Sequence, residues 1–425
     1  MAPKRPHRTA LVLSGGGARG AYEAGVIHYI RTAIAPKLGG ERTFDVLCGS
    51  SVGAINICLM AALAHSPKDQ GKMIYKLWKD LKQDQIYKRN LAAMGELLGR
   101  TTKGISSNLL KINPFKPTQR KTAEAHFRGF LDSSPLPAFI ESMVPFYNIE
   151  KNLKKKILAA VSLTATNVAT GHMELFVQKR ADVEYTGEYL HRFVELTAMH
   201  AAASAAIPII FPPVMVNNVY YTDGGLKLNT PMSPAIQLGA DKIMILGLHH
   251  RYEQGEQLLY SSPANQHPTL GQLVGLVMNA LFLDRIQYDI DQLTRINRLV
   301  QWSEKVYGAD YLDKINSMLT REGIKGDIAN RGLSRIEVFK MFPSRDVSGL
   351  FSECYQDEKS SNNSFNVFEK LLLRLLDIDP AAGVDILSYL AFMPSYIHKL
   401  LELGYDDAAS HRDEIIEFLT SDPRR

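Results

Sequence analysis

The sequence predicts an α/β fold: a three-layer α/β/α core on a mainly parallel sheet, followed by a mostly helical C-terminal region. Two observations lead to this prediction. Twice within the first 65 residues, a short apolar run ends in glycine and serine and passes into a helix-like stretch. After His250 the pattern becomes almost wholly helical. The repeated order of strand, glycine and helix is typical of a parallel sheet with helices on its faces.

The two leading strands are predicted at Thr9–Ser14 and Phe44–Cys48. Both are nearly continuous apolar runs, as expected for strands buried on both faces. The helices that follow begin at Ala18 and span Val52–Ala64. Further strands are predicted at Ile157–Thr166, Val219–Thr222 and Lys242–Leu248, and a strand at Ile336–Phe342 could return to the sheet edge.

The chain is expected to divide into a core domain over residues 8–250 and a mainly helical region over residues 251–425. A long helical and loop-rich insertion, residues 66–156, interrupts the core domain. Helices of the C-terminal region are predicted at Leu270–Val300, Phe365–Ile378 and Asp385–Leu403.

The positive charge is concentrated in the insertion. The whole chain has a net charge of +5, but thirteen Lys or Arg and four Asp or Glu lie between Gly71 and Arg128, which gives that stretch about +9. Such a patch attracts nucleic acid or an anionic membrane surface. Solvated helix faces are an equally good interpretation.

No apolar run is long enough to span a membrane, and the basic N-terminus lacks the core of a signal peptide. We therefore expect a soluble protein of the cytosol, with at most peripheral membrane contact; export by a route without a cleaved signal is the alternative. Cys48, Cys58 and Cys354 have neither paired spacing nor histidine companions, so buried thiols are expected and disulfides or zinc are not.

A candidate nucleophile follows the second strand. Residues Gly49–Gly53 read GSSVG and match G-x-S-x-G. A serine on a sharp strand-to-helix turn needs small residues two positions before and after it, because larger side chains would collide across the turn. Ser51 would stand at a helix N-terminus, which favours developing negative charge. A plain structural turn also matches this short pattern.

The glycine loop after the first strand fits two templates. Gly15, Gly17 and Gly20 match the dinucleotide fingerprint, yet the same amides could hold the oxyanion of an ester under attack. The dinucleotide template requires an acid near the end of the second strand, whereas Asp45 lies near its start. No Gly-Lys-Ser/Thr follows, which argues against a phosphate-binding P-loop. We favour an oxyanion hole.

A candidate partner for Ser51 is Asp223, which ends the strand at Val219–Thr222 and precedes Gly224 and Gly225. A serine hydroxyl is a weak nucleophile and needs a base. An aspartate at a strand end can reach a site at the same edge of a sheet. An ordinary Asx turn is the alternative.

The motifs LSGGGARG, GSSVG and DGG, in this order, resemble the patatin-like phospholipase family. The stretches Ser204–Pro213 and Thr164–Gly171 are similar to that family as well, so the resemblance covers roughly residues 8–250. The helical C-terminal region is similar to that of some bacterial members.

The resemblance implies a patatin-like core in which Ser51 and Asp223 form a catalytic dyad. It also implies an oxyanion hole of Gly15, Gly16 and Gly17, and a basic residue, Arg19, that supports the loop, meets a lipid phosphate or makes a surface ion pair. The other motif positions are Gly20, Gly49, Gly53, Gly224 and Gly225. The dyad requires no histidine; a triad using His249 or His250 is the alternative.

The resemblance further implies hydrolysis of fatty-acyl esters of phospholipids or lysophospholipids through an acyl-Ser51 intermediate. The alternatives are an acyltransferase with the same dyad and a lipid-binding or regulatory protein with an inactive site. No metal or organic cofactor is implied, and no nucleic-acid partner is expected. Transient membrane contact is expected through the insertion, with Trp78 as a headgroup anchor or a packed side chain, or through the apolar stretch Leu273–Leu283.

Overall fold

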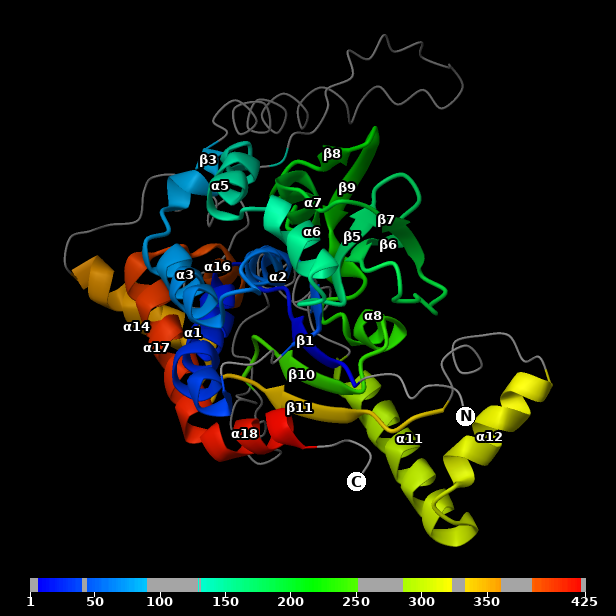
Figure 1. The fold of residues 1–425 in the computed structure, drawn as a ribbon. Coiled ribbons are helices and arrows are strands. Elements are labelled where there is room, and N and C mark those ends of the chain that lie inside the picture. Colours follow the sequence, from blue (N-terminus) through cyan, green and yellow to red (C-terminus); the bar gives the residue numbers. More distant parts are fainter. Residues whose placement is uncertain are drawn as a thin grey trace, which may run out of the picture.

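The computed structural model of the protein describes residues 7–39, 44–89, 129, 131–250, 286–322, 333–360 and 384–421. Their centre is a nine-stranded sheet in the order β11-β10-β1-β2-β5-β6-β7, with β9 also paired to β5 and β8 to β9 (Figure 1). The strands are β1 (Thr9–Leu13), β2 (Val46–Gly49), β5 (Ala160–Asn167), β6 (Met173–Lys179), β7 (Leu190–Phe193), β8 (Val214–Val216), β9 (Val219–Asp223), β10 (Lys242–Leu246) and β11 (Glu337–Met341).

The sheet is mostly parallel, as the sequence predicts. β11, β10, β1, β2 and β5 run in parallel, whereas β5 pairs antiparallel with both β6 and β9. Every strand predicted from the sequence is present. The sequence did not predict β6, β7 and β8.

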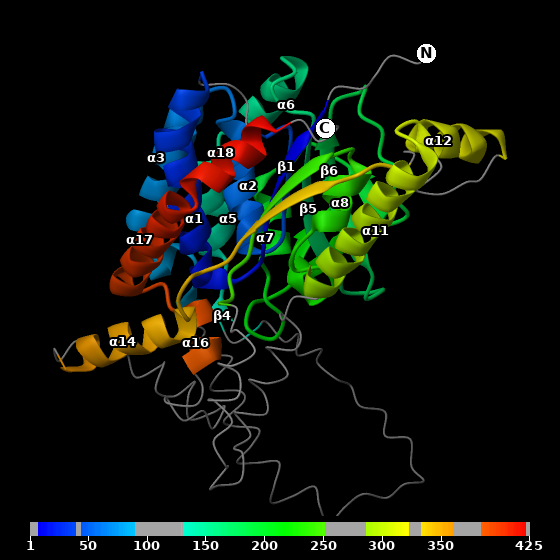
Figure 2. The ribbon, with the colours of Figure 1, turned by 90° about the horizontal axis from the view of Figure 1, so that it is seen from below.

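Alternate residues of the central strands face two separate apolar cores. Leu11 and Leu13 belong to the larger core, and Ala10 and Val12 to the smaller. Figure 2 shows helices on both sides of the sheet, which confirms the three-layer architecture. On the larger side pack α1 (Gly20–Tyr29), α2 (Val52–Ala62), α3 (Pro67–Lys79) and α17 (Pro394–Ser410), and on the other side α8 (Met232–Gln237) and α11 (Ile286–Tyr307).

The insertion contains α3, α5 (Pro135–Met143), α6 (Tyr147–Lys154) and a small antiparallel pair, β3 (Lys88–Arg89) with β4 (Leu131–Asp132). Residues 90–128 and 130 lie outside the described residues. Short elements complete this half of the chain: η1 (Gly17–Arg19), η2 (Ile30–Ile34), η3 (Ala35–Leu38), η4 (Gln83–Gln85), α7 (Ala198–Ser204) and η5 (Gly224–Leu226).

The C-terminal region returns to the sheet, because β11 pairs in parallel with β10 at the edge. It also supplies α12 (Tyr311–Arg321), α14 (Val347–Ser360), α16 (Val384–Leu390) and α18 (Arg412–Thr420). The stretch Asp385–Leu403 is helical, as predicted, but it is divided in two: α16 ends at Leu390 and α17 begins at Pro394. Proline disfavours a helical residue before it and is well tolerated in a first turn, so the chain breaks there. The predictions at 365–378 and 270–285 lie outside the described residues.

The three cysteines are buried and unpaired with one another, as predicted. Across the described ranges, none of the helices combines the length and the apolar character that a bilayer crossing needs.

Candidate active site

Ser51 occupies a strained turn between β2 and α2. Its backbone has φ 53° and ψ −127°, a region that side-chain-bearing residues rarely adopt. A Cβ on Gly49 would lie 2.5 Å from the carbonyl oxygen of Gly53, and a Cβ on Gly53 would lie 2.7 Å from that of Leu13. The G-x-S-x-G spacing therefore has the steric cause that the sequence suggests.

Asp223 approaches Ser51 from the neighbouring strands. β9 runs antiparallel to β5 and places Asp223 opposite Ala165, just beyond the carboxyl end of β2. The hydroxyl of Ser51 donates to Oδ2 of Asp223 at 2.6 Å, and the amide of Gly225 donates to Oδ1 at 2.7 Å. A side chain at Gly224 would collide with Thr164. Two residues 172 positions apart thus form a hydrogen-bonded pair.

The Asp223 carboxyl is fully buried, and burial raises its pKa to about 7 against the opposing effect of the hydrogen bonds from Ser51 and Gly225. Desolvation penalises the ionised form more than these two donors stabilise it. A base with a pKa near neutrality is suited to both accepting and returning a proton.

The glycine loop lies against Ser51, since a Cβ on Gly15 would lie 2.9 Å from the Cβ of Ser51. The amide of Gly15, however, donates to the carbonyl oxygen of Asn229 at 3.2 Å, so it is already engaged. Within the described ranges, no partner is recorded for the amides of Gly16 and Gly17. Of the three oxyanion donors expected from the sequence, these two remain as candidates.

Ser204 is a site residue that the sequence analysis missed. Its hydroxyl accepts a hydrogen bond from the amide of Ser51 at 3.0 Å and is completely buried at the end of α7. It therefore helps to hold the strained turn. The only sequence signal is its position at the start of the family-like stretch Ser204–Pro213.

The surface position that an exposed ion pair would require is wrong, because Arg19 is 1% exposed. Its guanidinium donates to the hydroxyls of Ser388, at 2.6 and 2.9 Å, and Ser348, at 2.9 Å. It also lies 4.1 Å above the ring of Tyr389. The loop and the C-terminal region are thus tied together, and the backbone of Tyr389 packs directly on Gly17.

Among the residues that the structure describes, neither histidine of the alternative triad is hydrogen-bonded to Ser51. The two ring nitrogens of His249 contact Arg19 and the hydroxyl of Tyr389, at 3.2 and 3.1 Å, and Nδ1 of His250 contacts the carbonyl oxygen of Pro343 at 2.9 Å. The recorded partner of the Ser51 hydroxyl is Asp223.

Replacing Arg19 with Ala is expected to lower the free energy of unfolding by about 3 kcal/mol, because buried hydroxyls lose charged partners. Loosening of the loop should also lower kcat by up to about 10²-fold with little change in KM. Thermal unfolding and steady-state kinetics measure both effects. The control is Arg345→Ala, which removes an exposed ion pair with Glu353 and should cost less than about 1 kcal/mol. Equal losses of unfolding free energy and of kcat in the two variants would contradict the role of Arg19 in holding the glycine loop.

A buried polar chain connects the glycine loop to α3. Glu23 accepts from the amide of Ser14 and from the Asn56 side chain, each at 2.9 Å, and Asn56 accepts from the indole of Trp78 at 2.9 Å. Burial raises the pKa of Glu23 well above its usual value. Gly20 is part of this buried polar chain, because Asn56 also donates to its carbonyl oxygen at 3.3 Å.

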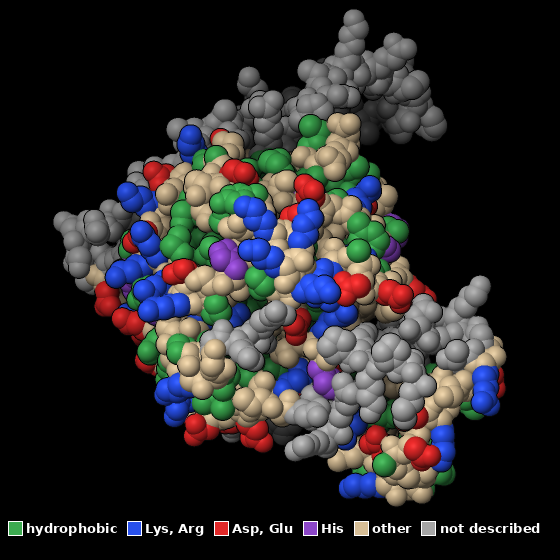
Figure 3. All heavy atoms as spheres, viewed as in Figure 1, with side chains coloured by type: hydrophobic (Ala, Val, Ile, Leu, Met, Phe, Trp, Pro, Cys, Tyr) green, Lys and Arg blue, Asp and Glu red, His purple; other side chains and the backbone are tan. Residues whose placement is uncertain are grey.

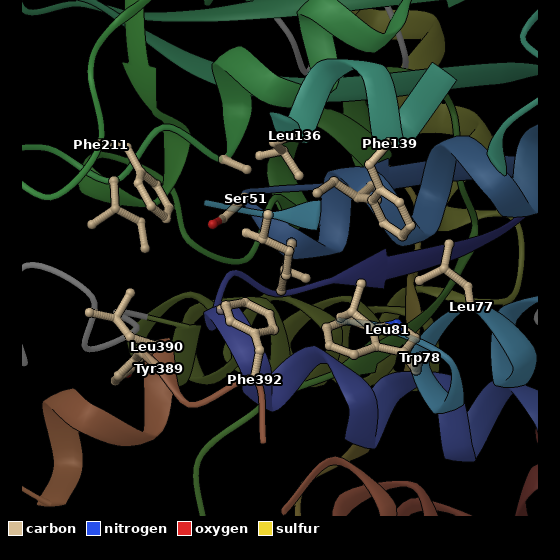
Figure 4. A pocket seen from close by; sticks show the side chains of 16 residues that line it. Ser51, Leu77, Trp78, Leu81, Leu136, Phe139, Phe211, Tyr389, Leu390 and Phe392 are labelled. Carbon is tan, nitrogen blue, oxygen red and sulfur yellow. The ribbon is translucent and has the colours of Figure 1, made fainter. Parts of the chain in front are cut away.

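Ser51 opens into an apolar pocket of about 530 Å³, a volume that includes its opening to solvent (Figure 4). Its lining comes from four parts of the chain: α2 with Ser51 and Gly17, the insertion, the loop after α7, and the C-terminal region. The residues are Gly17, Ser51, Val52, Ile55, Leu77, Trp78, Leu81, Ile86, Leu136, Phe139, Ala205, Ile207, Phe211, Tyr389, Leu390 and Phe392. Trp78 is 2% exposed, so its packing interpretation is correct and the headgroup-anchor interpretation is wrong.

The outer face of α3 and the turn after it carry exposed lysines. Lys72, Lys76, Lys79 and Lys82 are all exposed, whereas Leu77 and Trp78 between them are buried. Lys and Arg side chains gather over α3 and α6 in Figure 3. Among the residues that the structure describes, there is no group of three or more His, Cys, Asp or Glu side chains that could hold a metal ion.

A family model described as patatin-like phospholipase matches residues 11–236 of the chain. A search of curated proteins finds no match. Among solved structures, VipD from Legionella pneumophila is 14% identical, with 92% of each chain covered and a TM-score of 0.29. A chain of the heterodimeric ExoU–SpcU complex from the type III secretion system of Pseudomonas aeruginosa is 15% identical, with 96% of this chain and 76% of that chain covered and a TM-score of 0.27. At such low TM-scores, neither likeness bears on the reaction.

Proposed function

The chain belongs to the patatin-like phospholipase family, and on that premise we propose that it hydrolyses fatty-acyl esters of phospholipids or lysophospholipids through an acyl-Ser51 intermediate. The observation that carries the proposal is the 2.6 Å hydrogen bond between Ser51 and a buried Asp223, in a pocket lined by apolar side chains. A nucleophile bound to a base beside apolar space suits an ester with a fatty-acyl group.

In the proposed reaction, Oγ of Ser51 attacks the acyl carbon while Asp223 accepts its proton. The amides of Gly16 and Gly17 stabilise the oxyanion, an effect worth about 3–4 kcal/mol per donor in other hydrolases. The ester C–O bond then breaks, and the proton passes to the leaving alkoxide. Asp223 next takes a proton from water, whose oxygen attacks the acyl-enzyme. The bond between the acyl carbon and Oγ of Ser51 then breaks, Asp223 passes the proton to Oγ, and the fatty acid is released.

The proposed catalytic unit is residues 8–250, but the C-terminal region contributes to its pocket through Tyr389, Leu390 and Phe392. Together with the Arg19 contacts, this supports treating the helical region as part of the working enzyme. We therefore expect the full chain to be needed for activity.

Phospholipid vesicles incubated with the full chain test the proposal. Wild type should release free fatty acid and a lysophospholipid or its deacylated product, and Ser51→Ala should release neither. Adding a glycerol-type alcohol distinguishes hydrolysis from acyl transfer, because a transferase would form a new ester instead of free acid. Binding of lipid without any product would favour the non-catalytic alternative.

Contact with an anionic membrane through α3 is a separate proposal. Changing Lys72, Lys76, Lys79 and Lys82 to Glu should weaken binding to anionic vesicles by at least about 10²-fold, since each lysine near such lipid contributes about 1 kcal/mol. Hydrolysis of a soluble ester should stay unchanged. Lys305→Glu with Lys340→Glu, exposed lysines on α11 and β11, gives the per-charge control. Binding is measured by vesicle sedimentation, and its loss is divided by the number of lysines changed. An equal loss per lysine in the two sets would remove α3 from the contact.

A further inference from the structure

The pocket extends from Ser51 toward the insertion. Figure 4 shows Phe211 and Leu390 on one side of Ser51, and Leu81, Trp78, Phe139 and Leu77 on the other. The second side lies between α2, which contributes Val52 and Ile55, and side chains of α3 and α5. Leu77 and Phe139 lie at the end far from Ser51 in that view.

We propose that this part of the pocket holds the substrate's acyl chain and that Leu77 and Phe139 close its far end, so that they set the chain length the enzyme prefers. The inference rests on the proposed function and adds to it a preference for substrates of a certain acyl-chain length. Nothing in the G-x-S-x-G or glycine motifs determines this property, since both residues belong to the insertion.

The lining on this side suits a hydrocarbon chain and no polar group. Its side chains are apolar, and the one polar atom of Trp78 already donates to Asn56. A phosphate or an ammonium group placed there would lose its hydration without gaining a partner. The charges of α3 point the other way, because Lys76 and Lys79 are exposed.

The far end is firm because the helices behind it are packed. Leu77 is 4% exposed and lies on α3, whose Ile74 is completely buried in the larger core. Phe139 is half-buried, and its neighbour on α5, Ile140, is buried in the same core. A chain one or two methylenes too long must displace packed atoms, and protein interiors resist such displacement.

The test measures kcat/KM for saturated p-nitrophenyl esters of increasing chain length. Leu77→Ala and Phe139→Ala should move the optimum to longer chains, and Leu77→Phe should move it to shorter ones. One ester is the best substrate of wild type, and another is the best substrate of the variant. The ratio of their kcat/KM values should differ about tenfold or more between wild type and each variant. Trp78 is a poor probe, since its indole also supports Asn56 and Glu23.

Leu153→Ala provides the matched control. Leu153 is equally buried but lies on α6 and outside the pocket lining, so its loss should lower stability without moving the optimum. An optimum that stays fixed in all three pocket variants, or that moves equally in Leu153→Ala, would overturn the inference.

Binding to the Ser51→Ala protein separates this inference from the proposed reaction. Saturated fatty acids of increasing length should bind with an optimum that Leu77→Ala shifts in the same direction as in the kinetic series. If wild type hydrolyses no ester but this shift occurs, the chain-length assignment stands and the proposed reaction fails. If wild type hydrolyses esters and neither the kinetic nor the binding optimum shifts, the proposed reaction stands and the chain-length assignment fails.

Discussion

Replacing Ser51 with Ala is expected to lower kcat for acyl esters by at least about 10⁴-fold, the largest effect of any single substitution in this protein. The variant lacks the oxygen of the proposed nucleophile, while the pocket and the amides of Gly16 and Gly17 remain. Substrate binding should therefore change little. Steady-state kinetics with a soluble ester measure the loss.

Ser162→Ala is the matched control for this substitution. Ser162 is a buried serine on β5, and no hydrogen-bond partner is recorded for its hydroxyl among the described residues. Its replacement should leave kcat within a few-fold of wild type. Substantial activity in Ser51→Ala would show that another group is acylated.

Asp223→Asn is expected to give the second largest effect, a loss of about 10²–10⁴-fold in kcat, because an amide cannot accept the Ser51 proton. In wild type, kcat/KM should rise with pH through about 7 as the buried carboxyl ionises. The variant should lack that rise. A pH profile with the same rise in both proteins would contradict the assignment of Asp223 as the base.

The same substitution has a predicted effect on stability. The pKa of Asp223 rises from an ordinary 3.8 to about 7 in the fold, so its carboxyl favours folding at low pH, and this contribution is lost as pH rises through 7. The shift corresponds to a loss of about 4 kcal/mol in the free energy of unfolding between the ordinary pKa of 3.8 and the raised value of about 7. The melting temperature of Asp223→Asn relative to wild type should therefore increase from pH 5 to pH 8, which thermal unfolding measures. A constant difference would contradict the raised pKa.

Features that depend on neighbouring residues were predictable from the sequence. β1 and β2 are buried apolar runs that end in glycine, and the crowding of Gly49 and Gly53 follows from their spacing around Ser51. By contrast, all four residues of β7 are exposed, so it lacks the apolar pattern that identifies a buried strand.

Contacts between distant residues could not be predicted. The serines that hold Arg19 lie 329 and 369 positions from it, and no local pattern indicates them. Gly15 and Asn229, whose carbonyl oxygen accepts from the Gly15 amide, lie 214 positions apart. The burial of Trp78, however, had a signal: Ile74, Leu77, Trp78 and Leu81 form an apolar stripe at helical spacing, which outweighs the lysines beside it.

The most direct test of the Ser51–Asp223 dyad is treatment of the full chain with a fluorophosphonate, followed by mass spectrometry of its peptides. The dyad predicts one adduct, on Ser51, that disappears in Ser51→Ala and forms much more slowly in Asp223→Asn. An unlabelled wild type, or an adduct that persists when residue 51 is alanine, would contradict it.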